Sequence, residues 1–356
     1  MNGVGSGPRV LIVGAGHGCR VHLPALRGAG FDVVGLVGSD PGRIRAAADA
    51  HEVAGAYTDL DTAIAETGAT AVTIASPPLT HAPLSFTALA RGCHVLCEKP
   101  FAKDAAEAEG MLAAAEQAGI VHVMGNQMRT LPERIVICRA IADGLIGEPR
   151  LVSIVQYVGL VADPEARRPV WWFDREAGGG WLGASGSHMI DMIRSWLGDF
   201  ATVSAALPIV SDRANVAEDS FSVRFRTISG VEGVVQQTGG AWGAPVAMVR
   251  VAGTSGTVWL DGGRAWLADR EGTRELAVPA DLALVPMAPS SDPAKPYLHV
   301  ELPPSLRLME SWRAAIEGRP VPAPLANFAD GLAAMRVIDA IRASAAAGGA
   351  SIPVSS

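Results

Sequence analysis

The first third of the chain alternates short aliphatic runs with longer, alanine-rich stretches. The runs predict buried strands at Val10 to Val13, Phe31 to Val37, Gly55 to Thr58, Ala71 to Ala75, His94 to Cys97 and Ile120 to Met124. The stretches between them predict helices from near Cys19, at Pro41 to His51, Asp61 to Glu66, Thr80 to Arg91 and Asp104 to Ala118. Strands that alternate with helices in this way predict a doubly wound parallel sheet, an α/β architecture.

The pattern changes after about Asn126. We expect a helix at Pro132 to Asp143, a long strand at Arg150 to Val161 and a helix at Trp181 to Leu197. Strand-like runs then follow at Ala201 to Pro208, Asp219 to Thr227, Val231 to Gln237, Ala247 to Ala252 and Gly256 to Leu260. Because short turns join these runs, we expect them to be antiparallel. Pro279 to Pro304 reads as a loop, and two helices, at Pro304 to Glu317 and Asn327 to Ala346, close the chain.

Length and composition suit a globular chain of two domains. The chain has 356 residues, of which 49% are hydrophobic and 18% are charged. We expect a flexible tail at residues 1–8, a doubly wound α/β domain at 9–126 and an α+β domain at 127–356, whose last helix could pack back on the first domain. A net charge of −7 without a basic stripe argues against nucleic acid as a partner.

Membrane, export and metal signals are missing from the sequence. There is no apolar run of about 18 residues and no apolar leader at the N-terminus, so we expect a cytoplasmic protein. The four cysteines lack metal-ligand spacing, and we expect reduced core thiols and no metal. They are Cys19, Cys93, Cys97 and Cys138.

A glycine turn follows the first strand directly. Gly14 permits the tight turn, and Gly16 leaves room for a pyrophosphate beside the start of the next helix. Cys19 stands where the third glycine of the G-x-G-x-x-G pattern is usual, and its small side chain still permits close packing. We therefore expect Gly14, Gly16, His17 and Cys19 to bind a dinucleotide; the alternative is a structural glycine turn without a ligand.

The end of the second strand favours NADP over NAD. Gly38 stands where an acidic residue would hold the ribose 2′-hydroxyl. Without that carboxylate a 2′-phosphate is not repelled, Ser39 could hydrogen-bond it and Arg43 could pair with it. Asp40 offers a simpler reading of this segment, as the cap of the helix that begins at Pro41.

Polar residues follow the later strands at the edge where ligands of such sheets bind. They are Ser76 with Pro77, Glu98 with Lys99, and Asn126 with Gln127. The ammonium of Lys99 could stabilise an alkoxide as a hydride leaves, and the proline after it favours a cis bond that aims the side chain. The alternative is a surface lysine paired with Glu98.

A second candidate site lies on the helix expected at Trp181 to Leu197. His188 and Asp191 are three residues apart, so they share a helix face, where a neutral imidazole could take a hydroxyl proton and a carboxylate could orient it. A buried structural histidine is the alternative. Trp172 belongs to an aromatic group before Gly178 to Gly180 that could stack on a sugar ring or form a lid, or simply be a packed loop.

These elements together resemble the glucose–fructose oxidoreductase/inositol dehydrogenase/MocA (Gfo/Idh/MocA) family of NAD(P)-dependent oxidoreductases. The matching motifs are Gly14-Ala-Gly16 with His22-Leu-Pro24, Ser76-Pro-Pro78 with His81, Glu98-Lys-Pro100, Arg129 with Pro132, and Gly186-x-His188-x-x-Asp191. They span roughly Arg9 to Ile341.

The resemblance implies a Rossmann domain, an open and mostly antiparallel second sheet, and dimers or tetramers formed through that sheet. It implies hydride transfer between the nicotinamide and a sugar, cyclitol or related polyol. Lys99 would bind the substrate hydroxyl and His188 would be the acid/base. His81 and Glu98 would join the cofactor site, and Arg129 and Asp191 the substrate site.

One position departs from the family pattern. Ala184 stands where the family often has an aspartate, four residues before the histidine. Two alternatives to an oxidoreductase therefore stay open: an enzyme that uses NAD transiently for elimination or glycoside cleavage, and a non-catalytic dinucleotide-binding sensor.

Overall fold

The computed structural model describes residues 7–213, 217–292 and 297–355, and it divides them into two compact units. The first unit contains residues up to Ala102, Ala106–Leu131 and Asp281–Gly331. The second contains Lys103–Ala105, Pro132–Ala280 and residues from Leu332 onward. The first unit is thus built from segments far apart in the sequence, which a single boundary after residue 126 does not describe. Most of the expected N-terminal tail lies outside the described residues.

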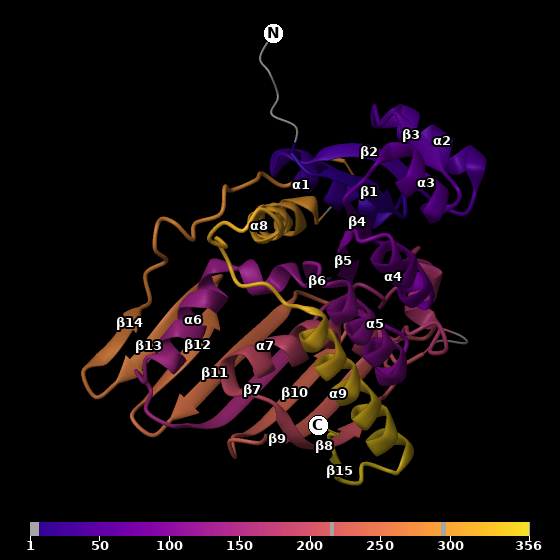
Figure 1. Cartoon of the computed structure of the whole chain (residues 1–356). Coiled ribbons are helices and arrows are strands. Elements are labelled where there is room, and N and C mark those ends of the chain that lie inside the picture. Colours follow the sequence, from indigo (N-terminus) through magenta and orange to yellow (C-terminus); the bar gives the residue numbers. More distant parts are fainter. Residues whose placement is uncertain (1–6, 214–216, 293–296, 356) are drawn as a thin grey trace. The chain divides into compact units, whose positions relative to one another are not determined.

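The first unit holds a parallel six-stranded sheet (Figure 1). Its strands are β1 (Arg9–Val13), β2 (Asp32–Val37), β3 (Gly55–Tyr57), β4 (Ala71–Ile74), β5 (His94–Glu98) and β6 (His122–Gly125). The order β3-β2-β1-β4-β5-β6 reverses between β1 and β4, as in dinucleotide-binding sheets, whose ligands lie at that reversal beyond the carboxyl ends of the strands. The predicted doubly wound sheet is confirmed.

Helices join these strands close to the expected bounds. They are α1 (Leu23–Gly28), α2 (Pro41–Ala50), α3 (Leu60–Thr67), α4 (His81–Ala90) and α5 (Ala105–Ala118). Asp40 caps α2 as expected, because its side chain accepts the backbone N–H of Arg43 at 2.8 Å. Thr80 occupies the N-cap position of α4, but its hydroxyl donates to the carbonyl of Pro77 at 2.8 Å and makes no capping hydrogen bond to the helix.

A long helix far along the sequence completes the core of the first unit. Helix α8 (Leu298–Ile316) packs beside α1, and Trp312 stacks on Phe31 with ring centroids 5.1 Å apart. The sequence placed the start of this helix at Pro304 and read the preceding residues as loop; the helix begins six residues earlier and contains Pro303 and Pro304. Residues 293–296 of the expected loop lie outside the described residues.

The second unit holds a nine-stranded sheet. Its strands are β7 (Pro149–Tyr157), β8 (Phe200–Ala206), β9 (Ser220–Thr227), β10 (Glu232–Thr238), β11 (Val246–Gly253), β12 (Gly256–Asp261), β13 (Arg264–Asp269), β14 (Gly272–Glu275) and β15 (Ile352–Pro353). The order is β14-β13-β12-β11-β7-β10-β9-β8-β15. Every pair is antiparallel except β7 with β10, because β7 inserts between β10 and β11. The expectation of a mostly antiparallel sheet is confirmed.

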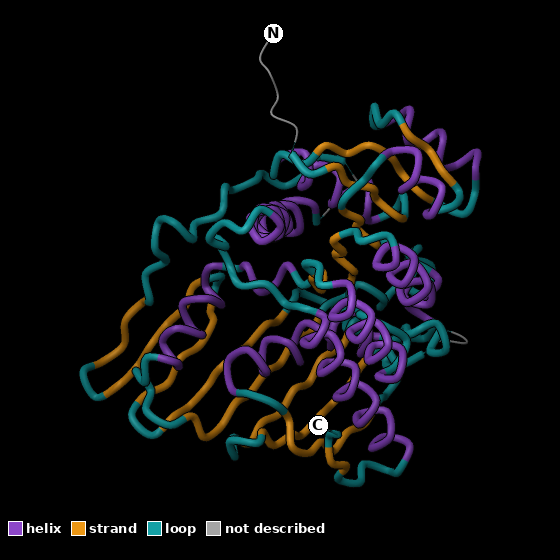
Figure 2. Tube along the Cα trace, viewed as in Figure 1, coloured by secondary structure: helices purple, strands orange, loops and turns teal. Residues whose placement is uncertain are grey.

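Helices cover one face of this sheet. Figure 1 shows α6 (Pro132–Ala142), α7 (Ser187–Leu197) and α9 (Phe328–Ala346) over the strands, and Figure 2 shows the same helices in purple against the orange strands. Alternate residues point to the other face, so that Leu151 is 54% exposed and Val234 is 45% exposed. Among the described residues, no helix is both long and apolar enough to cross a membrane.

Candidate active site

The glycine turn lies at the carboxyl end of β1, where the sheet order reverses. Gly14 has a φ of +100°, and a Cβ atom there would lie 2.6 Å from the carbonyl oxygen of Ala75, so only glycine fits. A Cβ on Gly16 would meet no atom within 4 Å, which leaves the turn open beside it. The turn therefore has the local shape that the sequence predicted.

Gly18 supplies the close packing that the sequence analysis assigned to Cys19. A Cβ on Gly18 would lie 2.7 Å from Cγ2 of Ile12 on β1. Cys19 is buried, and its segment, Gly18–His22, is a single turn of π-helix before α1. The glycine that brings helix and strand together is thus one position earlier than the motif places it, so cysteine at 19 costs no packing.

The carboxyl end of β2 has no acidic side chain at Gly38, whose N–H donates to the carbonyl of Tyr57 at 3.0 Å. A Cβ there would lie 3.0 Å from Cδ1 of Ile44, so a larger residue would require Ile44 to shift. Ser39 and Arg43 are exposed. Their side chains are therefore accessible at the strand end where the ribose of a dinucleotide binds in such folds.

The segment after β4 is tied to the segment after β5. Ser76 shares a hydrogen bond of 2.7 Å with Thr80. The His81 ring is fully buried, with Nε2 2.9 Å from the carbonyl oxygen of Ser76 and Nδ1 3.1 Å from that of Pro100. Burial lowers the pKa of His81 against the opposing effect of these carbonyls. His81 thus acts as a structural bridge here, and its contact with a cofactor stays a prediction.

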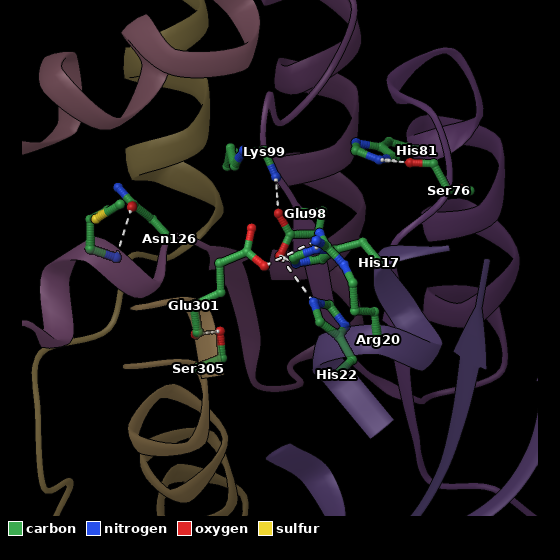
Figure 3. Close-up of polar contacts among 11 residues, drawn as sticks. His17, Arg20, His22, Ser76, His81, Glu98, Lys99, Asn126, Glu301 and Ser305 are labelled. Atoms are coloured by element: carbon green, nitrogen blue, oxygen red, sulfur yellow. Dashed lines mark hydrogen bonds and ion pairs between the residues drawn. The ribbon is translucent and has the colours of Figure 1, made fainter. Parts of the chain in front are cut away.

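Glu98, the last residue of β5, is the centre of a buried polar cluster (Figure 3). Its Oε2 accepts the backbone N–H of Lys99 at 3.1 Å. Its Oε1 lies 3.0 Å from Nε2 of His22 and 3.8 Å from Nε2 of His17. The peptide bond between Lys99 and Pro100 is cis, as the sequence predicted. The carboxylate therefore joins the glycine-turn segment to the backbone of Lys99.

The charges in this cluster follow from burial and from close partners. Burial lowers the pKa of His17 to about 3, although the Glu98 carboxylate acts in the opposite direction. Burial alone would raise the pKa of Glu98, but the hydrogen bond from His22 and the nearby cationic groups hold it below its ordinary value. At neutral pH His17 is therefore neutral and Glu98 is an anion.

A second carboxylate approaches the cluster from α8. Glu301 lies in the first turn of that helix, and its Oε2 is 3.3 Å from Nη1 of Arg20 (Figure 3). Nη2 of Arg20 is in turn 3.3 Å from Nδ1 of His17. Burial raises the pKa of Glu301, although Arg20 and Lys99 oppose this shift. Helix α8 thus contributes a charged side chain to the neighbourhood of Lys99.

Two further predicted residues of the first unit lie just after β6. Gln127 is buried and its Oε1 has no hydrogen-bond partner among the described residues. Arg129 donates to the carbonyl of Leu325 at 3.1 Å and pairs with Asp330 at 3.0 Å. These contacts give Arg129 a structural function, and its contact with substrate stays a prediction.

The second unit holds the predicted acid/base. His188 and Asp191 are both buried on α7, with exposed fractions of 7% and 0%. Burial of its head group lowers the pKa of Arg134 on α6, although the charges of Glu133 and Asp191 oppose this shift, so a partly buried arginine accompanies the Asp191 carboxylate. Ala184, where the family often has an aspartate, is also buried and lies in the π-helical turn Leu182–Gly186 before α7.

The triple glycine before α7 is a packing feature. A Cβ on Gly179 would lie 1.8 Å from the carbonyl oxygen of Trp171, and one on Gly180 would lie 2.0 Å from Oε1 of Glu218. Trp172 packs edge-on against Trp181 with centroids 5.8 Å apart. Of the alternatives left open for this segment, these contacts favour the packed loop over a hinge.

Comparison with known proteins agrees with this geometry. The family model "Oxidoreductase family, NAD-binding Rossmann fold" matches residues 8–126, and the model "GFO/IDH/MocA C-terminal domain" matches residues 136–259. The D-apiose dehydrogenase of Paraburkholderia graminis is 31% identical over 287 residues, which are 76% of this chain and 73% of that protein. The chain belongs to the Gfo/Idh/MocA family.

Other members are similar over comparable lengths. The inositol 2-dehydrogenase of Rhizobium meliloti is 30% identical and covers 69% of this chain and 73% of its own. A crystal structure of an oxidoreductase domain protein from Kribbella flavida has a TM-score of 0.83 at 27% identity, covering 99% of this chain and 100% of that one. A levoglucosan dehydrogenase in complex with NADH and L-sorbose has a TM-score of 0.84 at 24% identity, covering 98% and 99%, and shares the fold. The chain is thus an oxidoreductase of this family with an NAD-binding Rossmann domain.

Sequence reasoning missed three residues of this Gfo/Idh/MocA site. His22 was noted only as part of a motif, although it is 1% exposed and hydrogen-bonds Glu98. Gly125 admits the Glu98 carboxylate, because a Cβ there would lie 2.7 Å from Oε1. Glu301 lies in a segment that we read as loop. The position of His22 shortly after the glycine turn could have identified it from the sequence. Nothing in the sequence around Glu301 indicates that it lies near Glu98.

Proposed function

We propose that this Gfo/Idh/MocA protein transfers a hydride between a nicotinamide cofactor and a secondary alcohol, or the matching ketone, of a sugar, cyclitol or related polyol. The observation that carries the proposal is the placement of Lys99. It follows β5 at the same sheet edge as the Gly14 turn, and Glu98 holds its backbone N–H at 3.1 Å. The D-apiose and inositol dehydrogenases named above, which act on compounds of this class, support the substrate class.

Each residue has a distinct task in the proposed reaction. The bound dinucleotide supplies the hydride acceptor or donor. The turn Gly14 to Gly16 receives its phosphates, because the turn is open beside Gly16 and leads into a helical segment, whose start favours an anion. Lys99 polarises the substrate oxygen and stabilises negative charge that develops on it. His188 exchanges the hydroxyl proton, and Asp191 orients the imidazole.

A matched pair of lysine variants tests the chemistry. Lys99→Met should lower kcat on the best sugar or cyclitol by at least about a hundredfold with NAD(P)H affinity unchanged, because it removes charge stabilisation without touching the glycine turn. Lys103→Met, four residues on, is the control and should retain activity. His188→Asn should lower kcat by about a hundredfold as well. Full activity of Lys99→Met and of His188→Asn would refute the assignment.

We also propose a preference for NADP over NAD, supported by Gly38 and by the exposed side chains of Ser39 and Arg43. Arg43→Ala should weaken NADPH binding by about tenfold and leave NADH binding unchanged, since one charge-assisted contact is lost. Arg45→Ala, on the same helix and paired with Asp49 at 3.8 Å, is the control. Fluorescence titration of the nicotinamide measures both, and equal loss of NADH affinity in Arg43→Ala would argue against a 2′-phosphate contact.

A further inference from the structure

Three side chains with metal-ligating atoms meet beside the glycine turn. Among the residues that the structure describes, His17, His22 and Glu98 place one ligand atom each within 4.8 Å of one another. Two imidazoles and one carboxylate form a ligand set that Zn²⁺ accepts with one position left open. Figure 3 shows the two rings and the carboxylate directed toward one another.

The separations match a tetrahedral ion. Zn–N and Zn–O bonds of about 2.0–2.2 Å at a tetrahedral angle place two ligand atoms about 3.4 Å apart. Oε1 of Glu98 is 3.0 Å from Nε2 of His22 and 3.8 Å from Nε2 of His17. These two separations each differ from that spacing by about 0.4 Å. The ligand atoms of the two histidines lie within 4.8 Å of each other, so the rings must also move closer together before all three side chains bond one ion.

The carboxylate is held in position before any ion arrives. Its Oε2 accepts the N–H of Lys99, which leaves Oε1 directed at the two rings. Gly125 provides the space for Oε1, since a Cβ there would clash at 2.7 Å. His22 is 1% exposed and cannot easily turn away, whereas the side chain of His17 is 27% exposed and gives an ion access from solvent.

The surrounding groups limit the strength of binding. Nδ1 of His17 is 3.3 Å from Arg20, and Nδ1 of His22 has no hydrogen-bond partner among the described residues. A metal-bound histidine is normally supported by an acceptor at its other ring nitrogen, and loss of such support costs about 10–100-fold in affinity. The cations Arg20 and Lys99 also repel an ion, although Glu301 offsets Arg20.

The geometry points to a binding site for one Zn²⁺-class ion at His17, His22 and Glu98, with an open fourth position on the side of His17. The ion is exchangeable rather than structural, because the hydrogen bond between His22 and Glu98 already satisfies the pair without it. Imidazole ligands favour Zn²⁺ and Co²⁺ over Mg²⁺, which requires oxygen ligands in octahedral geometry.

Titration of the untagged, metal-free full chain with Zn²⁺ tests the site directly. Calorimetry should show one equivalent of Zn²⁺ bound in the micromolar range, and no binding of Mg²⁺ at the same concentrations. Co²⁺ in place of Zn²⁺ should give the visible absorption of a tetrahedral complex with nitrogen and oxygen ligands. Absence of Zn²⁺ binding, or a Co²⁺ spectrum dominated by thiolate charge transfer, would overturn the assignment.

Variants locate the ion. His17→Asn, at a partly exposed position, should raise the Zn²⁺ concentration needed for half saturation by at least about tenfold. The melting temperature should not change. Glu98→Gln keeps the shape of the side chain and should also weaken Zn²⁺ binding by at least about tenfold. His51→Asn, at the end of α2, is the control and should bind like the parent. Parent-like Zn²⁺ binding by His17→Asn and Glu98→Gln would place the ion elsewhere and refute the site.

NADH titration of the same preparations separates this inference from the proposed function. NADH binding without Zn²⁺ binding would remove only the metal site. Suppose instead that the parent protein binds Zn²⁺ but neither NADH nor NADPH, and that His17→Asn does not bind Zn²⁺. This result would support the metal site and remove the oxidoreductase proposal.

Discussion

Glu98 shows how one buried side chain links separate parts of the sequence. Its two oxygens contact the N–H of Lys99 and the imidazole of His22, which follows the glycine turn. A buried anion persists only when it is paired and hydrogen-bonded, and these contacts hold its pKa below the ordinary value. The position of Lys99 therefore depends on residues that never touch a substrate.

The variant Gly125→Ala tests whether the position of Lys99 depends on the Glu98 carboxylate. The new methyl group would lie 2.7 Å from Oε1 of Glu98, so the carboxylate must move and Lys99 with it. We expect a loss of about 1–3 kcal/mol in the free energy of unfolding and a fall in kcat of at least about tenfold.

Gly42→Ala on α2 is the matched control, because its Cβ would meet only Asp40 at an ordinary 3.5 Å. It should be neutral or stabilise the chain by up to about 1 kcal/mol, since alanine favours a helix interior. Denaturant melts and steady-state kinetics measure both variants, and equal kcat values in the two would contradict the expected link.

Glu218 predicts a pH dependence of stability. Burial raises its pKa, although Arg342 and Arg175 act against the shift. Because the folded-state pKa lies above the unfolded one, this group contributes most stability below its unfolded pKa, and that contribution is lost as the pH rises through the folded pKa. Glu218→Gln should remove this loss and make the chain more stable than the parent at neutral pH.

Urea melts between pH 4 and pH 8 measure the effect of Glu218→Gln. The difference in unfolding free energy between variant and parent should grow with pH, by no more than about 1.4 kcal/mol per pH unit for a single proton. A difference independent of pH would mean that the carboxyl titrates normally. Glu275→Gln, on exposed β14, is the control variant.

Among the elements, hydrophobic runs were the most predictable feature. The six strands of the first sheet and six of the second follow from aliphatic runs, because a buried strand needs such side chains whatever surrounds it. Strands β13, β14 and β15 were missed, since Arg264–Asp269, Gly272–Glu275 and Ile352–Pro353 are short and contain few buried side chains. Pairing along the sheet edge, and not composition, makes them strands.

Other misses come from tertiary packing. Pro303 and Pro304 indicated that a helix could begin only at about residue 304, yet α8 begins at Leu298, because the packing of its buried face against the first unit outweighs the lost backbone donors. The same packing brings Glu301 to the cluster around Glu98. A local pattern cannot report which distant segment will return to a site.

Substitution of Trp312 tests how much α8 contributes to the free energy of unfolding. The side chain is fully buried and stacks on Phe31. Trp312→Ala should lower the free energy of unfolding by about 3–5 kcal/mol, because it leaves a large cavity. Trp312→Phe should cost far less, since the Nε1 donor of Trp312 has no partner among the described residues. Thermal melts of the two variants check this, and a small effect of the alanine variant would show that α8 contributes little to the first unit.

For the whole molecule, the uncovered face of the nine-stranded sheet predicts association of two chains. Leu151, Val234 and Met248 are 54%, 45% and 40% exposed on β7, β10 and β11, neighbouring strands of one sheet. Val155 pairs with Met248 in the same region. Exposed apolar side chains on neighbouring strands favour an interface, and we expect a second copy of this chain to cover them.

Val234→Lys with Met248→Glu should shift the protein toward monomer, because charged side chains oppose burial of this face. Val321→Lys, at an exposed apolar position in the first unit, is the control and should leave the assembly unchanged. Light scattering after size-exclusion chromatography gives the mass. A monomeric parent protein would show that the face serves another purpose.

The first unit is formed by segments that lie far apart in the sequence, and this affects how it folds during synthesis. The ribosome releases the strands β1 to β6 first, but Asp281–Gly331, which belongs to the same unit, emerges only after Pro132–Ala280 of the second unit. Until then Phe31 lacks Trp312, and the surface that α8 will cover faces solvent. The N-terminal part of the nascent chain must therefore wait, with apolar surface uncovered, while the second sheet is made, and this interval is when a chaperone would have most to bind.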